Sequence, residues 1–217
     1  RDQAGSGFDE PRVRAFLEQG PKAIEFFMAN TAVQFDMPLT FPDYHAEAPG
    51  GAQGGRSMVT RPYDARELGP LLKTLGPVLP ELTVFGVTIG SGKDIVHFMR
   101  ATRSLESAWY VARRLARHFV EVLMHGRGML LTNGNALAAR LARSASDLKI
   151  PVWLSSPAVQ LLRDGSRVAG AVVEREGQRL SVRARHGVVL ASGGFPHDTV
   201  RIERTYAHVA RGHGHWS

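Results

Sequence analysis

The chain has 217 residues, of which 43% are apolar and 22% charged, with 23 glycines and 12 prolines. This composition is typical of a globular protein and excludes collagen-like and intrinsically disordered chains. No apolar run reaches the roughly 20 residues that a helix needs to cross a bilayer, and no signal-peptide pattern is present. Because the chain opens on Arg1 rather than on Met, we expect it to be a piece of a longer protein.

The net charge of +7 is unevenly distributed along the chain. Residues 1–99 carry 9 basic and 12 acidic side chains, whereas residues 100–217 carry 18 basic and 8 acidic ones. A basic excess suits either nucleic acid or an anionic cofactor, but the arginines are scattered without interleaved aromatics, which disfavours nucleic acid. The absence of cysteine excludes disulfides and thiol chemistry and fits a cytoplasmic protein.

The first part of the chain is predicted to be helical on either side of one long loop. Apolar spacing predicts two short helices over residues 10–30, separated by a turn at Gly20-Pro21. Residues 31–65 are rich in Pro and Gly, and irregular segments of this length are usually functional or disordered. A short helix is expected over 70–75, whereas the segment 82–102 stays ambiguous because its glycines break any regular period.

Two longer helices are predicted next. Residues 105–124 show an apolar stripe at helical spacing, which predicts a helix with its apolar face on the core. This stripe consists of Ala108, Val111, Ala112, Leu115, Phe119 and Leu123. A second helix is expected through about Asp147, with Asn135 as its N-cap. Its predicted inner face consists of Leu137, Ala138, Leu141 and Ala142.

The last third of the chain changes to the pattern of strands. Short strands are predicted over residues 150–154, 158–162, 167–174 and 179–184, with Asp164-Gly165 and Glu176-Gly177 as turns. The apolar run 187–191 predicts a strand buried on both faces. Helices, antiparallel strands and a buried strand together predict an α/β fold with an antiparallel β-meander.

The buried strand leads directly into Ala191-Ser192-Gly193-Gly194, the most informative candidate site. Small residues at a strand end let backbone N–H groups approach a phosphate or ribose. Open α/β sheets bind their ligands at such strand ends. A tight turn without a ligand is an equal alternative. Gly90-Ser91-Gly92-Lys93-Asp94 resembles a P-loop, but Asp94 stands where the hydroxyl for magnesium is needed, and no GxGxxG follows a strand.

Two other groups of residues carry candidate chemistry. His208, His213 and His215 suggest a metal, but residues 204–217 contain no Asp or Glu and are interrupted by two glycines, so no metal site is predicted. Tyr44, beside Asp43 in the long loop, is a candidate acid or base. The alternative for Tyr44 is simple packing in the loop.

Two stretches of the chain resemble one family of flavoproteins. Residues 168–174 and 184–195, the latter ending in Val-Val-Leu-Ala-Ser-Gly-Gly-Phe, are similar to the FAD-dependent oxidoreductase 2 family of fumarate reductases and 3-ketosteroid Δ1-dehydrogenases. Helix 134–141 resembles the family's Gly-Gly-x-x-Leu helix. Residues 41–57, with Phe41-Pro42-Asp43-Tyr44 and Gly54-Gly55-Arg56-Ser57, are similar to the ketosteroid dehydrogenase branch, as is the terminal His215-Trp216-Ser217.

The resemblance implies that residues 1–217 are part of a Rossmann-like FAD-binding domain. The family's N-terminal GxGxxG unit and its C-terminal segment are missing from this sequence, and a substrate cap domain would start near 196–217. FAD is the implied cofactor. The backbone of Val159 would meet its adenine end, and Ala191, Ser192, Gly193 and Gly194 would let the chain pass close to the dinucleotide.

The implied reaction is dehydrogenation of a 3-ketosteroid or related ketone, with hydride transferred to the flavin. Phe41 would line the steroid slot, and Tyr44 would hydrogen-bond a catalytic phenol and help to lower its pKa. We expect the fragment itself to be inactive, with no nucleic-acid partner, and to be able to self-associate through the strand 187–191. A fumarate-reductase-like enzyme, and a non-catalytic or nucleic-acid-binding module, remain as alternatives.

Overall fold

A computed structural model describes residues 5–206 of the chain. It divides into two compact units, Arg1–Val152 and Trp153–Ser217, and each unit is described by itself. Within the described residues, every helix is too short or too polar to cross a membrane.

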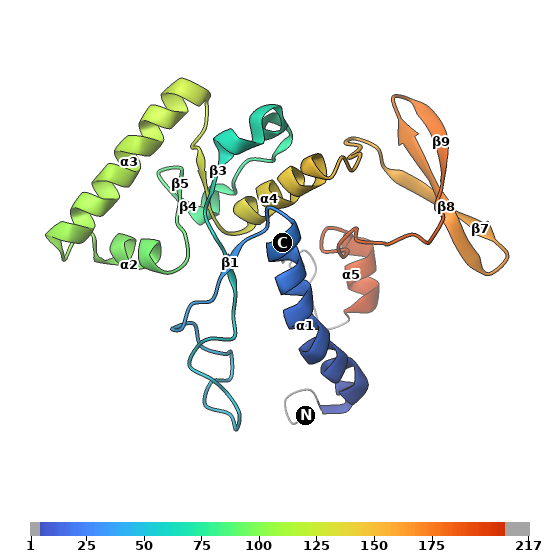
Figure 1. Ribbon diagram of the computed structural model, residues 1–217, viewed down its shortest axis with the longest axis horizontal. Helices are drawn as coiled ribbons and strands as arrows, with labels where there is room; N and C mark the ends of the chain where they lie inside the picture. The colour runs from blue at the N-terminus through green and yellow to red at the C-terminus, as the bar shows by residue number, and fades with distance from the viewer. Residues whose placement is uncertain (1–4, 207–217) are drawn as a thin grey trace. The chain divides into compact units, whose positions relative to one another are not determined.

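The first unit is mainly helical. It contains η1 (Gly5–Gly7), α1 (Glu10–Asn30), β1 (Phe35–Asp36), β2 (Val59–Thr60), β3 (Tyr63–Asp64), η2 (Ala65–Thr74), η3 (Pro80–Leu82), β4 (Thr83–Val84), β5 (Val87–Thr88), α2 (Lys93–Arg100), α3 (Leu105–His125), β6 (Leu130–Leu131) and α4 (Asn133–Asp147). The short strands pair antiparallel as β1–β2, β3–β6 and β4–β5. The ambiguous segment 82–102 therefore forms a small hairpin followed by α2 (Figure 1).

The helix α1 is continuous, so the prediction of two short helices is wrong. Pro21 lies inside the helix. A proline inside a helix removes one hydrogen bond and crowds the carbonyl four residues earlier, but the helical turns continue on both sides of Pro21. The side chain of Asp9 caps the N-terminus by accepting a hydrogen bond from the backbone N–H of Arg12 at 3.1 Å. No residue of α1 is buried.

The core of the first unit lies between η2, the β3–β6 pair and α4. Its buried members are Tyr63, Ala65, Leu68, Met129, Leu131, Ala136 and Ala139. The guanidinium group of Arg140 covers the Tyr63 ring at 4.9 Å and donates to the carbonyl groups of Ala32 and Pro62, at 2.7 and 2.9 Å. One arginine of α4 thus fixes the chain on both sides of the β1–β2 pair.

The helix α4 is confirmed, but its predicted cap and inner face are shifted. Thr132, not Asn135, occupies the N-cap position. The buried residues are Ala136, Ala139 and Ser144, whereas Leu141 is 45% exposed. Small side chains at these positions let the helix backbone approach the β3–β6 pair closely, a preference that an apolar-stripe pattern does not reveal.

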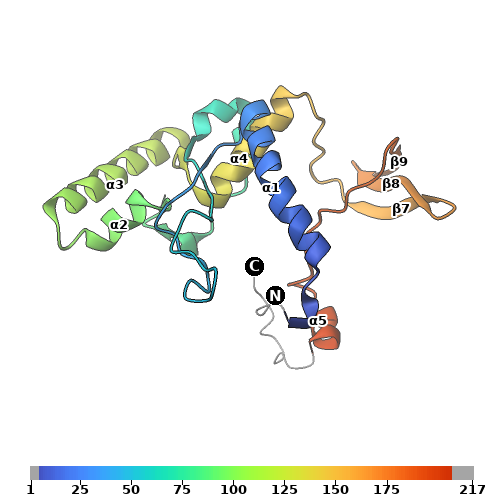
Figure 2. The same ribbon diagram turned by 60° about the horizontal axis from the view of Figure 1, so that its bottom comes forward.

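The helix α3 is also confirmed, but its apolar stripe does not face the core of this unit. Phe119 is 57% and Leu123 is 88% exposed, whereas the buried residues of the helix are Ser107 and Glu121. The two helices α2 and α3 lie side by side (Figures 1 and 2). Polar side chains with specific partners fill the contact and decide which face of α3 is turned inward.

The second unit contains a three-stranded meander followed by a short helix. Strands β7 (Ala158–Asp164), β8 (Arg167–Arg175) and β9 (Gln178–Arg183) pair antiparallel in chain order and precede α5 (Thr199–Thr205). The turn between β8 and β9 has positive φ at Glu176 and Gly177, 51° and 76°, as a two-residue hairpin turn requires. The predicted α/β class with an antiparallel meander is confirmed.

The predicted strands 150–154 and 187–191 are absent from the structure. Neither segment belongs to any ladder among the described residues, and Val189 and Leu190 are 90% and 71% exposed. Apolar, β-prone residues form a strand only where another strand pairs with them. The run 187–191 therefore has strand composition without strand pairing.

Candidate functional site

Asp43 organises the loop that carries the sequence-predicted substrate residues. Its Oδ2 accepts hydrogen bonds from the backbone N–H of Ala52 and from Nη1 of Arg56, both at 3.0 Å. Its own backbone N–H donates to the carbonyl of Ala52 at 2.9 Å. The two halves of the motif 41–57 are therefore joined through one carboxylate.

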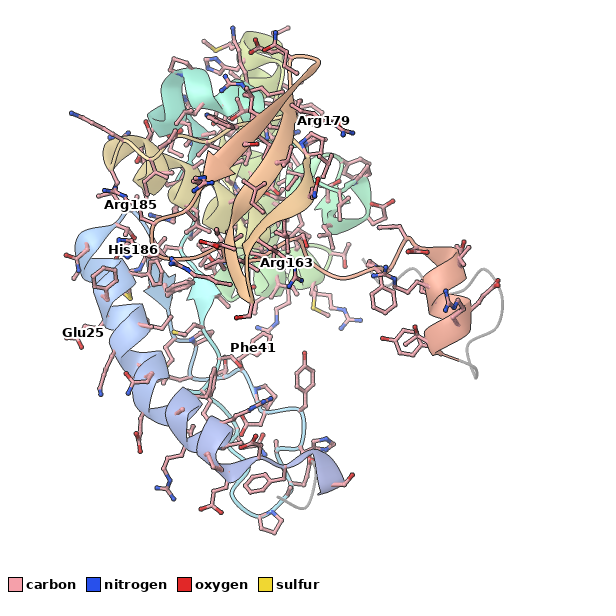
Figure 3. All side chains as sticks on the ribbon, turned by 90° about the vertical axis from the view of Figure 1, so that its right-hand side faces the viewer. Glu25, Phe41, Arg163, Arg179, Arg185 and His186 are labelled. Carbon is pink, nitrogen blue, oxygen red and sulfur yellow. The ribbon has the colours of Figure 1, made fainter. Side chains whose placement is uncertain are left out.

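Phe41 and Tyr44 occupy the same loop but have different surroundings. The Phe41 side chain is 50% exposed and lines a cavity of about 470 Å³ against the start of α2; Figure 3 labels this residue. The Tyr44 side chain is fully exposed, and its hydroxyl makes no hydrogen bond within residues 5–206. The structure thus brings Phe41 to a cavity and leaves the Tyr44 phenol accessible to a further group.

The Phe41 cavity includes residues that sequence reasoning did not select. Its lining consists of Pro38, Thr40, Phe41, Ser91, Gly92, Lys93, Ile95, Val96 and His97. Lys93 and His97 are four residues apart on α2 and therefore lie on one face of the helix. The spacing of four residues between Lys93 and His97 could have indicated a shared helix face, but the glycines before Lys93 made a helix hard to predict there.

A polar cluster behind this cavity joins α2 to α3. Asp94 accepts hydrogen bonds from the Tyr110 hydroxyl, from Nη2 of Arg114 at 3.1 Å and from the backbone N–H of Gly90 at 2.9 Å. Burial and then the hydrogen bond to Asp94 raise the pKa of Tyr110. Asp94 therefore serves as a structural anchor, which is a different use from the P-loop position considered in the sequence.

His97 is held in place by the same cluster. Its ring stacks on Tyr110 with centroids 4.3 Å apart, and its Nδ1 lies 3.1 Å from Oγ of Ser107. Within the described residues, Nε2 of His97 makes no hydrogen bond. Where the Ser107 hydroxyl donates to Nδ1, Nε2 carries the proton and acts as a donor.

Glu121 forms a second buried anchor, on α3. Its carboxylate accepts from Nε of Arg117 at 2.8 Å, from the backbone N–H of Met129 at 2.7 Å and from Nη2 of Arg66 at 3.1 Å. Burial acts to raise the pKa of Glu121, but these hydrogen bonds outweigh it and hold that pKa below its ordinary value. Glu121 also lines a cavity of about 640 Å³, which contains none of the predicted site residues.

Residues 191–194 in the second unit, which we call the glycine turn, have an irregular backbone with free space around it. Gly193 adopts a left-handed conformation with φ of 77°, and a Cβ placed there would meet no atom within 4 Å. A Cβ on Gly194 would contact only Cδ of Pro196, at 3.7 Å. No backbone N–H of Ala191, Ser192, Gly193 or Gly194 donates a hydrogen bond within the described residues. Free amides on a bare turn fit an anionic, closely approaching group such as the pyrophosphate of FAD.

Val159 lies at an irregularity of the strand β7. The register passes from Ala158 opposite Val173 to Gln160 opposite Val172, so that Val159 is the extra residue of a β-bulge. A bulge leaves the backbone of its extra residue outside the ladder. The arginines around the meander, Arg163, Arg179 and Arg185, are labelled with His186 in Figure 3.

Comparison with known proteins identifies the family. A family model described as an FAD binding domain matches residues 1–217, the whole chain. The chain belongs to the FAD-binding-domain family. The predicted resemblance to these flavoproteins and the prediction of FAD as cofactor are confirmed.

The relatives in this family are dehydrogenases. The chain is 35% identical to 4-oxocyclohex-2-ene-1-carboxylate 5-dehydrogenase of Sinomonas cyclohexanicum, over 100% of this chain and 37% of that protein. It is 31% identical to 3-oxosteroid 1-dehydrogenase of Comamonas testosteroni, over 86% of this chain and 33% of that protein. The chain thus spans about a third of the length of the curated relatives it matches.

A solved structure of the same class has a similar fold. The 3-ketosteroid Δ1-dehydrogenase of Sterolibacterium denitrificans, in complex with 1,4-androstadiene-3,17-dione, superimposes with a TM-score of 0.79 at 32% identity. The match covers 90% of this chain and 36% of the enzyme. The histidines 208, 213 and 215 and the terminal Trp216-Ser217 lie outside the described residues.

Proposed function

We propose that the whole protein containing this chain is an FAD-dependent dehydrogenase that oxidises a carbon–carbon bond beside a ring ketone, with 3-ketosteroids as the first substrate class. The observation that carries the proposal is the bare glycine turn 191–194, together with the Asp43-organised loop that presents Phe41 and Tyr44. The relatives named above are dehydrogenases of an oxosteroid and of an oxocyclohexene carboxylate, and both of these compounds are cyclic ketones.

The residues of the second unit would hold the dinucleotide. Gly193 and Gly194 leave room for the backbone to approach it, and the free amides of this turn donate to its negatively charged pyrophosphate. The bulged backbone of Val159 offers hydrogen-bonding groups to the adenine end. Bound FAD supplies the hydride acceptor that dehydrogenation requires.

The residues of the first unit would act on the substrate. Phe41 presents an apolar ring to the flat face of the substrate, since its side chain is half exposed in a cavity. The free hydroxyl of Tyr44 donates a hydrogen bond to a catalytic phenol and thereby favours the phenolate, the form that accepts the proton beside the ketone. Asp43 and Arg56 fix the loop, so that both side chains keep their positions.

The proposal is tested with the full-length protein. Purified protein is expected to carry FAD and to reduce an artificial electron acceptor when androstenedione is added. Fumarate with a reduced dye serves as the comparison, because the fumarate-reductase alternative predicts turnover only there. A colourless protein that takes up no added FAD, or one that acts on fumarate and on no ring ketone, would refute the proposal.

Four other predictions remain open: the cytoplasmic location, inactivity of the fragment, its self-association and the absence of a nucleic-acid partner. Gel filtration of the fragment and its salt-dependent retention on DNA test the last two predictions directly.

A further inference from the structure

The cavity beside Phe41 combines apolar surface with two basic side chains. Pro38, Phe41, Ile95 and Val96 provide the apolar part, and both Ile95 and Val96 are 47% exposed. Lys93 and His97 provide the polar part. A ligand that matches this lining has a flat apolar body and a polar group at one edge.

The charge of the cavity is not balanced by the protein. No Asp or Glu belongs to its lining, and neither Lys93 nor His97 forms an ion pair within residues 5–206. The adjacent carboxylate, Asp94, already accepts hydrogen bonds from Tyr110, Arg114 and Gly90. Asp94 is therefore committed to the α2–α3 contact and leaves the positive charge of Lys93 available.

The position of His97 is fixed before any ligand binds. Stacking on Tyr110 and the hydrogen bond with Ser107, which is itself only 3% exposed, restrain the imidazole ring. A restrained donor loses less conformational entropy on binding than a free one. Lys93, one turn earlier on the same helix face, adds a flexible positive charge.

We propose that this cavity binds a carboxylate carried by the ring ketone, so that this protein prefers anionic cyclic ketones over neutral ones as substrates. The inference rests on the proposed function, since it concerns the substrate of the same site. Phe41 contacts the ring, while Lys93 and His97 hold the carboxylate. Two sources share this chemistry: a 3-ketosteroid with a carboxylate side chain, and a single ring such as 4-oxocyclohexane-1-carboxylate.

The test compares each keto acid with its methyl ester on the full-length FAD-loaded protein, using an artificial electron acceptor. We expect kcat/KM to be at least tenfold higher for one acid than for its ester, mainly through KM. The pair that shows the larger ratio identifies the ring system.

In Lys93→Met this acid-to-ester ratio is expected to fall about tenfold, the effect of one lost charge-assisted contact of about 1.4 kcal/mol. Lys22→Met, which removes an exposed lysine of α1, is the matched control and should keep the ratio.

A second measurement requires no variant. Because ions screen an attraction between a carboxylate and an accessible ammonium group, added salt should lower kcat/KM for the acid and leave that for the ester constant. Equal kcat/KM for acids and esters, or a ratio that is the same in Lys93→Met and the wild type, overturns the inference while the ketone dehydrogenase function stands. Failure to oxidise any acid, ester or neutral steroid instead overturns the proposed function itself.

Discussion

Asp43 and Arg56 form an ion pair of 3.0 Å that closes the loop between the two halves of the motif 41–57. The Asp43 side chain is 25% exposed and also accepts from the backbone of Ala52. The Asp43 carboxylate thus binds both the guanidinium group of Arg56 and the backbone of Ala52. This arrangement explains how an aspartate and an arginine 13 residues apart close one loop.

Replacing Asp43 should impair the reaction of the full-length protein more than its folding. In Asp43→Ala we expect kcat/KM for the ketone to fall roughly tenfold or more, because a displacement of Phe41 and Tyr44 of about 1 Å is costly to catalysis. FAD content should stay at the wild-type level. Steady-state kinetics and flavin absorbance measure both quantities.

A matched control for this variant lies in the same region of the chain. Asp36 accepts from Nε of Arg61 at 2.6 Å in an exposed ion pair outside the motif. Exposed pairs contribute about 0–1 kcal/mol, so Asp36→Asn should leave kcat/KM near the wild-type value. Equal losses in both variants would contradict a specific role for Asp43.

Tyr44 should affect the acidity of the catalytic base rather than cofactor binding. Tyr44→Phe removes the hydroxyl that we propose donates to the catalytic phenol, so kcat should fall about tenfold or more. The same loss favours the protonated phenol, and the pH profile of kcat/KM should move to higher pH. A pH profile that is unchanged in Tyr44→Phe would show that this hydroxyl only contacts solvent.

Gly193 and Gly177 form a matched pair for testing the FAD turn. Their φ values are 77° and 76°, and a Cβ at either position meets no atom within 4 Å. An alanine at each position therefore costs a similar backbone strain of about 1 kcal/mol. Only Gly193 is proposed to lie against the dinucleotide, so Gly193→Ala should weaken FAD binding while Gly177→Ala does not. Flavin fluorescence titration of the apoprotein measures this difference, and equal Kd values would contradict the assignment.

Glu121 should control the stability of the protein in acid. Its pKa lies below the ordinary value, so its stabilising contribution is present above the unfolded-state pKa of about 4.3 and is lost as the pH falls through the folded-state pKa. Glu121→Gln should lower the free energy of unfolding by about 2 kcal/mol at pH 7, because hydrogen bonds to a charged group are lost.

The pH dependence separates this effect from simple misfolding. The difference in unfolding free energy between Glu121→Gln and the wild type should shrink over the pH range below the unfolded-state pKa of about 4.3, as the wild-type carboxylate also becomes protonated. Urea unfolding at several pH values measures this difference. A difference in unfolding free energy that stays constant across this pH range would mean that the charge of Glu121 contributes nothing to stability.

The sequence by itself determined the family, the cofactor, the β7–β9 meander and the lengths of α3 and α4. These features depend on local information: strand alternation, turn residues such as Glu176-Gly177, helical periodicity and a short motif of small residues. Each can be read from residues within a few positions of one another, because the hydrogen bonds and turn conformations involved are themselves local.

Only the tertiary structure decided which faces are buried and which residues share the cavity. The apolar stripe of α3 predicted an apolar contact, but Ser107 and Glu121 are buried because they find partners on other elements, His97 of α2 for Ser107 and Arg66 of η2 for Glu121. Likewise, Lys93 and Phe41 line the same cavity although they are far apart in the sequence. The run 187–191 has strand composition but no paired neighbour among the described residues. Burial, strand pairing and charge partnership depend on what lies opposite in space, and a local pattern does not carry that information.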